Sequence, residues 1–175
     1  MPKNKAVQGV QIYIMRHGIA TMPGSDRSID DSERTLTPQG RSKCKQIGKG
    51  LARLGVKLDW IVTSPLVRAS ATAKIIAESL GTEIPMDFCE ALCPGEPPEK
   101  LLEFLKQHSQ RKRILVVGHE PDLSILAGRL IGAGRGAGLA FKKGGCCLVL
   151  CDQLSLKTPG RLLWWMTPRV LRAIS

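Results

Sequence analysis

Four side chains that can bind an anion or move a proton follow strand-like segments of this sequence. Each segment is a short apolar run rich in β-branched residues, which favours a buried strand. The carboxyl ends of parallel strands meet at one edge of a sheet, where ligands bind in open α/β folds. We therefore expect the four side chains to share one pocket. They are Arg16, His17, Arg68 and His119.

Three strand segments lead to these four side chains. The run from Val10 to Met15 leads directly into Arg16, His17 and Gly18, and Gly18 is expected to let the backbone turn sharply because glycine tolerates unusual dihedral angles. Arg113 to Gly118 leads into His119, as expected for a central strand. The third run, Leu58 to Thr63, precedes Ser64-Pro65, a cap-plus-proline pair that predicts a helix with Arg68 in its first turn.

Two guanidinium groups and two imidazoles form a site for a tetrahedral oxyanion, most naturally phosphate. Phosphoryl transfer needs an in-line nucleophile and stabilisation of the charge on the equatorial oxygens. A neutral imidazole can be that nucleophile near neutral pH, and a second, protonated imidazole adds a donor. The reaction would run through a covalent phosphohistidine that water hydrolyses. A single histidine after a strand is more often structural, so the joint pattern carries this hypothesis.

The remaining pattern alternates strands with helices and predicts an α/β sandwich with a mainly parallel sheet and helices on both faces. We expect one domain over residues 1–175. The helices are predicted from Thr37-Pro38 to Gly55, from Ser64-Pro65 to Gly81, from Glu99 to His108 and from Leu123 to Ile131. Further strands are predicted at Ile84 to Cys89, Cys146 to Cys151 and Leu162 to Met166, the last two antiparallel. Loops are predicted at Ile19 to Thr35 and Glu90 to Pro98, and a flexible glycine-rich loop at Gly132 to Gly145.

We expect the chain to act in the cytoplasm and to need no metal or cofactor. No apolar run reaches the ~18 residues of a membrane helix, and no secretory signal is visible, so we expect no membrane partner. The six cysteines form no C-x-x-C pair, lie far in sequence from the three histidines, and are expected to be reduced. Cys146 and Cys147 lie in an apolar run and are predicted to be core residues.

A net charge of +11 points to a negatively charged partner, although many of these cations would only solvate the surface. Phosphorylated substrates, acidic proteins and nucleic acid all fit this charge. Nucleic acid is the weakest fit, because three Trp, one Tyr and three Phe residues are not interleaved with the basic clusters as stacking platforms. A phosphorylated protein or a small phosphorylated molecule is the expected partner.

Four motifs, in order, make the sequence resemble the histidine phosphatase superfamily, which has the phosphoglycerate-mutase-like fold. They are Met-Arg-His-Gly at Met15 to Gly18, Leu-Thr-Pro-Gln-Gly at Leu36 to Gly40, Ser-Pro-Leu-Val-Arg-Ala at Ser64 to Ala69, and Val-Gly-His-Glu-Pro at Val117 to Pro121. The compact length, the Leu-Cys-Pro-Gly-Glu loop and the late Trp-Trp-Met-Thr-Pro segment are most similar to the SixA-type phosphohistidine phosphatases.

This resemblance implies roles for the candidate residues. His17 would be the nucleophile, and Arg16, Arg68 and His119 would bind the phosphoryl group. The proton donor of the family is an acidic residue after the third strand. Glu90 matches that position best, Glu96 competes with it, and Glu90 could equally be a surface carboxylate paired with a cation.

The implied substrate is phosphohistidine on a phosphotransfer protein of two-component signalling. Mutases of the family carry long insertions over the pocket, whereas this chain has only the loop from Glu90 to Pro98 there. An uncovered pocket admits a side chain on a protein surface, and a phosphoramidate leaves more readily than an alkoxide. The alternatives are a small-molecule phosphomonoesterase of the same superfamily and, more distantly, a basic module that binds nucleic acid or acidic proteins.

Overall fold

The computed structural model describes residues 9–22, 30–81, 83–134 and 138–175. Its strands are β1 (Val10–Arg16), β2 (Trp60–Thr63), β3 (Met86–Phe88), β4 (Arg113–Gly118), β5 (Cys146–Cys151) and β6 (Arg161–Met166). Its α-helices are α1 (Pro38–Arg53), α2 (Val67–Leu80), α3 (Pro98–Lys106), α4 (Asp122–Leu130) and α5 (Pro168–Ile174). Short 3-10 helices cover Asp31–Glu33 and Glu90–Leu92.

The strands form one sheet in the order β3-β2-β4-β1-β5-β6. The first four run parallel, so β1, β2 and β4 end at the same edge of the sheet. β5 runs antiparallel to β1, and β6 antiparallel to β5. The sequence prediction of a mainly parallel sheet with an antiparallel final pair is therefore confirmed.

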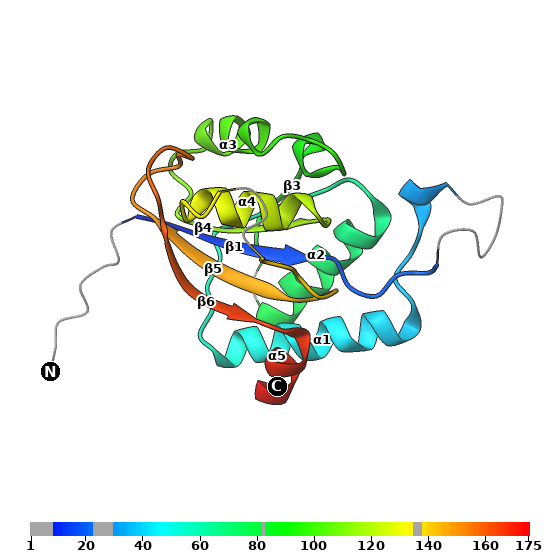
Figure 1. Ribbon diagram of the computed structural model, residues 1–175. Helices are drawn as coiled ribbons and strands as arrows, with labels where there is room; N and C mark the ends of the chain where they lie inside the picture. The colour runs from blue at the N-terminus through cyan, green and yellow to red at the C-terminus, as the bar shows by residue number, and fades with distance from the viewer. Residues whose placement is uncertain (1–8, 23–29, 82, 135–137) are drawn as a thin grey trace, which may run out of the picture.

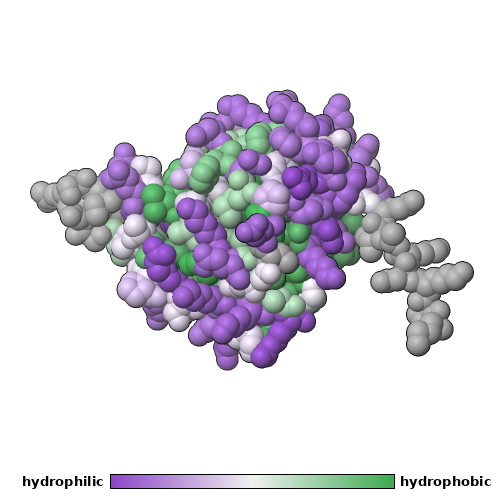
Figure 2. Space-filling view, turned by 180° about the vertical axis from the view of Figure 1, so that it is seen from behind, coloured by the Kyte–Doolittle hydropathy of each residue, from purple (hydrophilic) through white to green (hydrophobic). Residues whose placement is uncertain are grey.

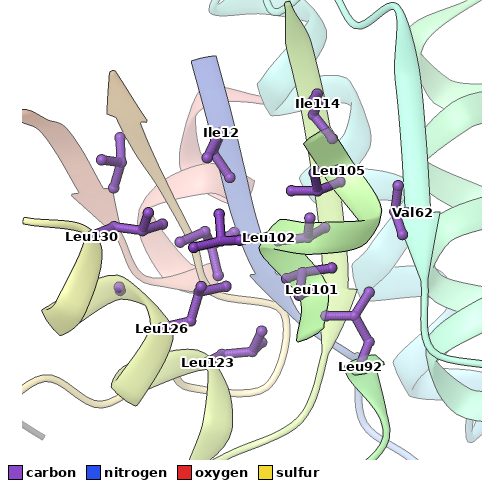
Figure 3. Close-up of a cluster of buried hydrophobic side chains, with 14 of the residues drawn as sticks. Ile12, Val62, Leu92, Leu101, Leu102, Leu105, Ile114, Leu123, Leu126 and Leu130 are labelled. Carbon is purple, nitrogen blue, oxygen red and sulfur yellow. The ribbon is translucent and has the colours of Figure 1, made fainter. Parts of the chain in front are cut away.

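Helices cover both faces of this sheet (Figure 1). Successive strand residues point to opposite sides, and the buried strands present apolar side chains on both. In β1, Ile12 and Ile14 pack with leucines of α3 and α4 on one face (Figure 3). Tyr13 and Met15 pack on the other face with residues of α1, α2 and α5. Each face thus has its own apolar core, and the three-layer α/β fold is as expected.

Two elements differ from the sequence prediction. The helix expected to open at Ser64-Pro65 begins instead at Val67, and its first turn has no side-chain cap. The Ser64 hydroxyl accepts a hydrogen bond from the Leu66 amide at 3.3 Å and contacts the site described below. The prediction also missed α5, whose start is capped by the Thr167 side chain.

The glycine-rich loop from Gly132 to Gly145 has no regular secondary structure where it is described, as expected. However, its second half is packed: Phe141 is 2% exposed and stacks on Trp165. Gly144 donates its amide to the carbonyl oxygens of Arg16 and His17, both at 3.1 Å. These contacts hold the later part of the loop against the end of β1, which the expectation of a flexible loop did not include.

Most of the apolar residues lie inside the molecule. Cys146 and Cys147 are fully buried, which confirms that they are core residues, and all six cysteines are unpaired. Hydrophilic side chains cover most of the face shown in Figure 2, with apolar areas between them. In the described ranges, no helix is long and apolar enough to cross a membrane.

Candidate active site

The end of β1 holds Arg16 and His17 through backbone contacts on both sides. The His17 amide donates to the Gly118 carbonyl of β4, and the Arg16 amide donates to the Gly145 carbonyl. The Arg16 guanidinium donates through Nη1 to the Phe141 carbonyl at 2.8 Å. The packed half of the glycine-rich loop therefore orients this arginine.

His17 is 6% exposed, and its hydrogen bond to Gly18 determines which ring nitrogen carries the proton. Its Nδ1 lies 2.7 Å from the carbonyl oxygen of Gly18. Because a carbonyl oxygen only accepts hydrogen bonds, Nδ1 carries the proton, and Nε2 of the neutral ring keeps its lone pair. Among the described residues no group bonds to Nε2. Within the described part of the chain, Nε2 therefore has an electron pair that no hydrogen bond uses.

Gly18 is needed at this point for space. Its φ is not among the positive values of the chain, so the expected unusual dihedral angle is not its reason. A Cβ here would lie 2.5 Å from the sulfur of Cys44. The Gly18 amide donates to Thr72 Oγ1 at 3.0 Å, and the Thr72 hydroxyl donates to the Arg68 carbonyl at 2.7 Å. This chain of bonds ties the turn after His17 to the first turns of α2.

Arg68 is 4% exposed and projects from the first turn of α2. Its Nη1 donates to the carbonyl oxygen of Asp31 at 2.5 Å, and its Nη2 pairs with the Asp31 carboxylate at 2.9 Å. Asp31 also pairs with Arg34 at 2.7 Å. The short helix Asp31–Glu33 therefore lies against Arg68 and holds the outer part of the guanidinium.

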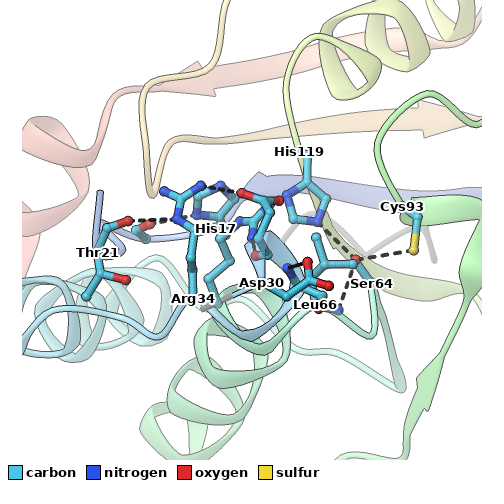
Figure 4. Close-up of polar contacts among 12 residues, drawn as sticks. His17, Thr21, Asp30, Arg34, Ser64, Leu66, Cys93 and His119 are labelled. Carbon is cyan, nitrogen blue, oxygen red and sulfur yellow. Dashed lines mark hydrogen bonds and ion pairs between the residues drawn. The ribbon is translucent and has the colours of Figure 1, made fainter. Parts of the chain in front are cut away.

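His119, 3% exposed, follows β4 and lies beside His17. The two ring centroids are 5.1 Å apart, with planes inclined by 51°. Its Nε2 lies 2.9 Å from the hydroxyl of Ser64, at the end of β2 (Figure 4). The strand ends thus bring both imidazoles together, as the parallel sheet required.

Buried nitrogen atoms without a partner mark the centre of this cluster. Within the described part of the chain, four buried side-chain nitrogens lack one: Arg16 Nε, Arg68 Nε, His119 Nδ1 and Arg111 Nε. Three of the four belong to the residues that the sequence singled out. Since an unsatisfied buried polar atom costs about 1–3 kcal/mol, such a concentration indicates a site that binds an acceptor-rich ligand.

Burial also keeps both imidazoles neutral. Desolvation, with smaller contributions from His119, Arg68 and Arg16, lowers the pKa of His17 to about 3 and outweighs the opposing hydrogen bond to Gly18. Desolvation, followed by the charge of Arg68, lowers the pKa of His119 to about 4. Near neutral pH the cluster therefore combines two neutral imidazoles with two guanidinium cations, which suits an incoming anion.

The sequence carries a family signature that includes three of the site residues, Arg16, His17 and Arg68. A sequence model of the histidine phosphatase superfamily (branch 1) matches residues 12–93. An uncharacterized protein of Picosynechococcus sp. is 33% identical over 140 residues, which cover 78% of this chain and 82% of the relative. The chain belongs to the histidine phosphatase superfamily.

Two more proteins resemble this chain, one in structure and one in sequence. The structure of the protein histidine phosphatase SixA complexed with tungstate has a TM-score of 0.80 at 23% identity, covering 93% of this chain and 99% of that one. This likeness shows a shared fold. A Salmonella typhi protein named "Probable phosphoglycerate mutase GpmB" is 34% identical over 120 residues, 68% of this chain. The chain spans only 55% of that relative.

The acidic residue that the superfamily resemblance implied is linked to the histidines only indirectly. Glu90 begins the short helix after β3 and accepts a hydrogen bond from the Cys93 thiol at 3.3 Å. Cys93 in turn lies 3.9 Å from the Ser64 hydroxyl. Glu90 therefore reaches His119 only through two intervening side chains, with no direct contact.

Glu96, the competing residue, is engaged elsewhere. Its carboxylate pairs with Lys100 at 2.6 Å, one helical turn further along. No described contact links it to either histidine. Of the two carboxylates, Glu90 is the one that the structure connects to the site.

Three further residues that hold the site were not found from the sequence: Asp31, Ser64 and Glu120. The Glu120 carboxylate accepts hydrogen bonds from the Phe141 amide and, at 2.6 Å, from the Ser124 hydroxyl. It thereby fixes the segment whose carbonyl holds Arg16. Glu120 adjoins His119 within a recognised motif, so its position was a usable signal, whereas Asp31 lies in a polar loop without one.

A cavity of about 630 Å³ lies away from the site. It is lined by the segment from Gly55 to Asp59, which precedes β2, and by Arg111 and Arg113 at the start of β4. These residues lie at the opposite edge of the sheet from the strand ends that carry the histidines. This cavity is therefore separate from the candidate active site.

Proposed function

We propose that the chain is a metal-independent phosphatase in which His17 is the nucleophile. One observation carries this proposal: His17, with an unprotonated Nε2, lies in one cluster with Arg16, Arg68 and His119, each of which has a buried nitrogen without a partner among the described residues. A bound phosphoryl group offers the oxygens that these nitrogens lack. Membership of the histidine phosphatase superfamily supports the same assignment.

The reaction would take place in two displacements. His17 Nε2 attacks phosphorus, so a nitrogen–phosphorus bond forms while the bond to the leaving group breaks and that group departs with its electron pair and takes up a proton. Arg16, Arg68 and His119 bind the equatorial oxygens throughout. Water then attacks the phosphohistidine, the nitrogen–phosphorus bond breaks, and inorganic phosphate leaves.

Trapping the intermediate tests this proposal. The chain is incubated briefly with a phosphorylated donor, quenched in alkali and analysed by mass spectrometry. Acid-labile phosphate is expected on His17 in the unsubstituted protein and to be absent from His17→Ala. His108→Gln is the matched control, because the His108 ring packs against Trp60, tilted by 40°, away from the site. A phosphoenzyme that persists in His17→Ala would reject His17 as nucleophile.

For the substrate we propose phosphohistidine on an acidic phosphotransfer protein. A ridge of exposed cations, Arg41, Lys45, Lys49 and Arg53, follows α1 at four-residue spacing, and α1 contains no acidic residue. Residues four apart share one helix face, so the ridge is ~18 Å long. No residue of the ridge forms an ion pair within the described chain.

This ridge starts beside the candidate site. The amide of Thr37, which caps α1, donates to the carbonyl of Ile19, two residues beyond His17. Like charges at four-residue spacing destabilise a helix by about 0.2–0.5 kcal/mol per pair, a cost that an acidic partner would offset. The fold shared with the protein histidine phosphatase SixA fits a substrate borne on a protein surface.

Charge reversal on the ridge separates a protein substrate from a small one. Lys45→Glu is expected to lower kcat/KM at least fivefold for a phosphorylated phosphotransfer protein, while leaving hydrolysis of an aryl phosphate unchanged. Lys106→Glu is the control, because α3 lies on the other face of the sheet. If both substitutions act equally on the protein substrate, the ridge is not a docking surface.

The second candidate is a small phosphate ester, which the relationship to the phosphoglycerate mutase GpmB favours. A panel of sugar phosphates, phosphoglycerates and an aryl phosphate distinguishes the two. We expect the phosphorylated protein to give the highest kcat/KM. A sugar phosphate or phosphoglycerate that exceeds it would establish the small-molecule function.

The six unpaired cysteines suit a reducing compartment, and we propose the cytoplasm as the place of action.

A further inference from the structure

The hydrogen-bond partner of the His119 ring determines what the ring can offer a ligand. Its Nε2 bonds to the Ser64 hydroxyl at 2.9 Å, whereas its buried Nδ1 has no partner among the residues that the structure describes. A neutral imidazole carries its single proton on one of these two nitrogens. With the proton on Nε2, a bare lone pair on Nδ1 would face the oxygens of a bound phosphate and repel them.

The surroundings of Ser64 leave its proton for His119. The hydroxyl oxygen already accepts a hydrogen bond from the Leu66 amide at 3.3 Å. The nearby Cys93 thiol donates to Glu90 at 3.3 Å, so this thiol has its own acceptor. Of the contacts that the hydroxyl makes with described side chains, the one to Nε2 of His119, at 2.9 Å, is shorter than the one to the Cys93 sulfur at 3.9 Å.

We propose that Ser64 is a positioning residue: its hydroxyl donates to Nε2 of His119, fixes the neutral ring with the proton on Nδ1, and so makes His119 a hydrogen-bond donor to the phosphoryl group. The part of this inference that concerns phosphate rests on the proposed function. It differs from the sequence expectation, in which the second histidine had to be protonated to donate. The low pKa of His119, about 4, agrees with a ring that acts in its neutral form.

The two neighbouring imidazoles thereby acquire opposite roles from their partners. A carbonyl oxygen accepts from Nδ1 of His17 and leaves Nε2 free to attack. A hydroxyl donates to Nε2 of His119 and leaves an N–H on Nδ1. Neither role requires an imidazolium ion, which burial next to two arginines would disfavour.

The backbone around Ser64 explains why the hydroxyl is available. The Ser64 amide donates to the Val117 carbonyl at 2.9 Å, which holds the residue at the carboxyl end of β2 beside β4. Because α2 begins only at Val67, the Ser64 hydroxyl does not serve as its N-cap. Pro65 has no N–H that could compete for the hydroxyl oxygen.

Nuclear magnetic resonance of the full chain with ¹⁵N-labelled histidine tests the tautomer directly. Long-range ¹H–¹⁵N spectra near pH 7 are expected to show His119 with its proton on Nδ1, and His17 likewise. In Ser64→Ala, His119 should move to the tautomer protonated on Nε2, which free imidazole favours. Ser64→Thr keeps a hydroxyl and should keep the proton on Nδ1. Cys93→Ala removes the other neighbour of the Ser64 hydroxyl and should change nothing.

Titration with inorganic phosphate supplies the second measurement. Loss of one donor to a charged ligand predicts about tenfold weaker binding in Ser64→Ala, with Ser64→Thr and Cys93→Ala within twofold of the unsubstituted chain. A His119 ring protonated on Nε2 in the unsubstituted chain overturns the proposal even if Ser64→Ala does not fold. An unchanged phosphate affinity in folded Ser64→Ala also overturns it. If the tautomer is as expected but the unsubstituted chain neither binds nor releases phosphate, the proposed function fails instead.

Discussion

The carboxylate of Asp31 lies 2.9 Å from Nη2 of Arg68, while the backbone carbonyl of the same aspartate accepts a hydrogen bond from Nη1. One residue therefore engages both terminal nitrogens of an arginine whose Nε is unpartnered in the candidate site. The hydrogen bond from Arg34, and then that from Arg68, lowers the pKa of Asp31, so the carboxylate is charged near neutral pH. The Asp31 carboxylate is therefore a negative charge of the protein itself, next to the position proposed for a bound phosphate.

Removing this charge should strengthen phosphate binding. In Asp31→Asn the carbonyl contact to Arg68 remains, but the negative charge that competes with and repels phosphate is gone. The dissociation constant of inorganic phosphate, measured by calorimetry, is expected to fall roughly tenfold, or about 1.4 kcal/mol. Glu33→Gln removes a charge from the same short helix without touching Arg68 and is the control. Weaker binding in Asp31→Asn would show that the carboxylate mainly orients the arginine.

Loss of Arg68 itself should be severe. An arginine that stabilises the transferring group supplies ~10³-fold in rate, or about 4 kcal/mol. Arg68→Ala is therefore expected to lower kcat/KM for an aryl phosphate by about that factor. Arg68→Lys should recover little, because a lysine lacks the planar fork. Arg161→Ala, an exposed arginine on β6, is the control, and an Arg68→Ala enzyme of near-normal rate would remove Arg68 from the site.

Glu90 should matter more for esters than for phosphoramidates. An alkoxide leaving group needs a proton, whereas an imidazole leaves more readily. Glu90→Gln is expected to lower kcat for an alkyl phosphate by 10²-fold or more and for phosphohistidine by less than tenfold. Glu96→Gln, whose native carboxylate pairs with Lys100, should leave both rates unchanged. Equal losses on both substrates in Glu90→Gln would exclude Glu90 as the proton donor.

Stability should depend on pH through the two buried histidines. Their folded pKa values, about 3 for His17 and about 4 for His119, lie below the ~6.5 of an unfolded histidine. As pH falls below ~6.5 the unfolded chain binds protons that the folded chain does not, so the free energy of unfolding declines toward pH 4 and is restored as pH rises. Each histidine contributes a slope of up to about 1.4 kcal/mol per pH unit.

Urea titrations between pH 7 and pH 5 measure this slope. His17→Gln should reduce it by the contribution of one histidine, because glutamine does not titrate. Identical slopes for His17→Gln and the unsubstituted chain would mean that His17 does not stay neutral on folding.

Gly144 should tolerate a side chain less well than Gly134 of the same loop. Gly134 and Gly144 both have positive φ, +76° and +83°, so alanine at either costs about 1–2 kcal/mol in backbone strain. A Cβ at Gly134 meets nothing within 4 Å, whereas one at Gly144 lies 2.8 Å from the Cδ1 of Ile47. Gly144→Ala should therefore lower the free energy of unfolding by roughly 1 kcal/mol more than Gly134→Ala.

The same pair should differ in function. Gly144 bonds to the carbonyls of Arg16 and His17, so shifting it displaces both side chains and should weaken phosphate binding. Gly134→Ala should leave phosphate binding unchanged. Equal phosphate affinities in the two variants would show that Gly144 does not position Arg16 and His17 for phosphate binding.

Periodicity and local signals were enough to predict most elements of the fold. The run from Val10 to Met15 is β1 less its last residue, and Thr37-Pro38 opens α1 with the expected side-chain cap. α5 was missed although Thr167 caps its start, and the start of α2 was misplaced because a local signal has a competing tertiary use. Ser64 has the chemistry of a helix cap, but its hydroxyl bonds to His119, and α2 begins uncapped at Val67.

By itself, the sequence determined which residue types end the strands of this protein, and hence that two arginines and two histidines would meet at one edge of the sheet. That inference needs only alternation of elements and parallel strands, which are local properties. The tertiary structure decided which atom of each side chain is free. The decisive partners lie far away in the chain: Asp31 is 37 residues from Arg68, Ser64 is 55 from His119, and Phe141 is 125 from Arg16. Hydrogen bonds over such separations exist only once the chain has packed, so no local pattern encodes them.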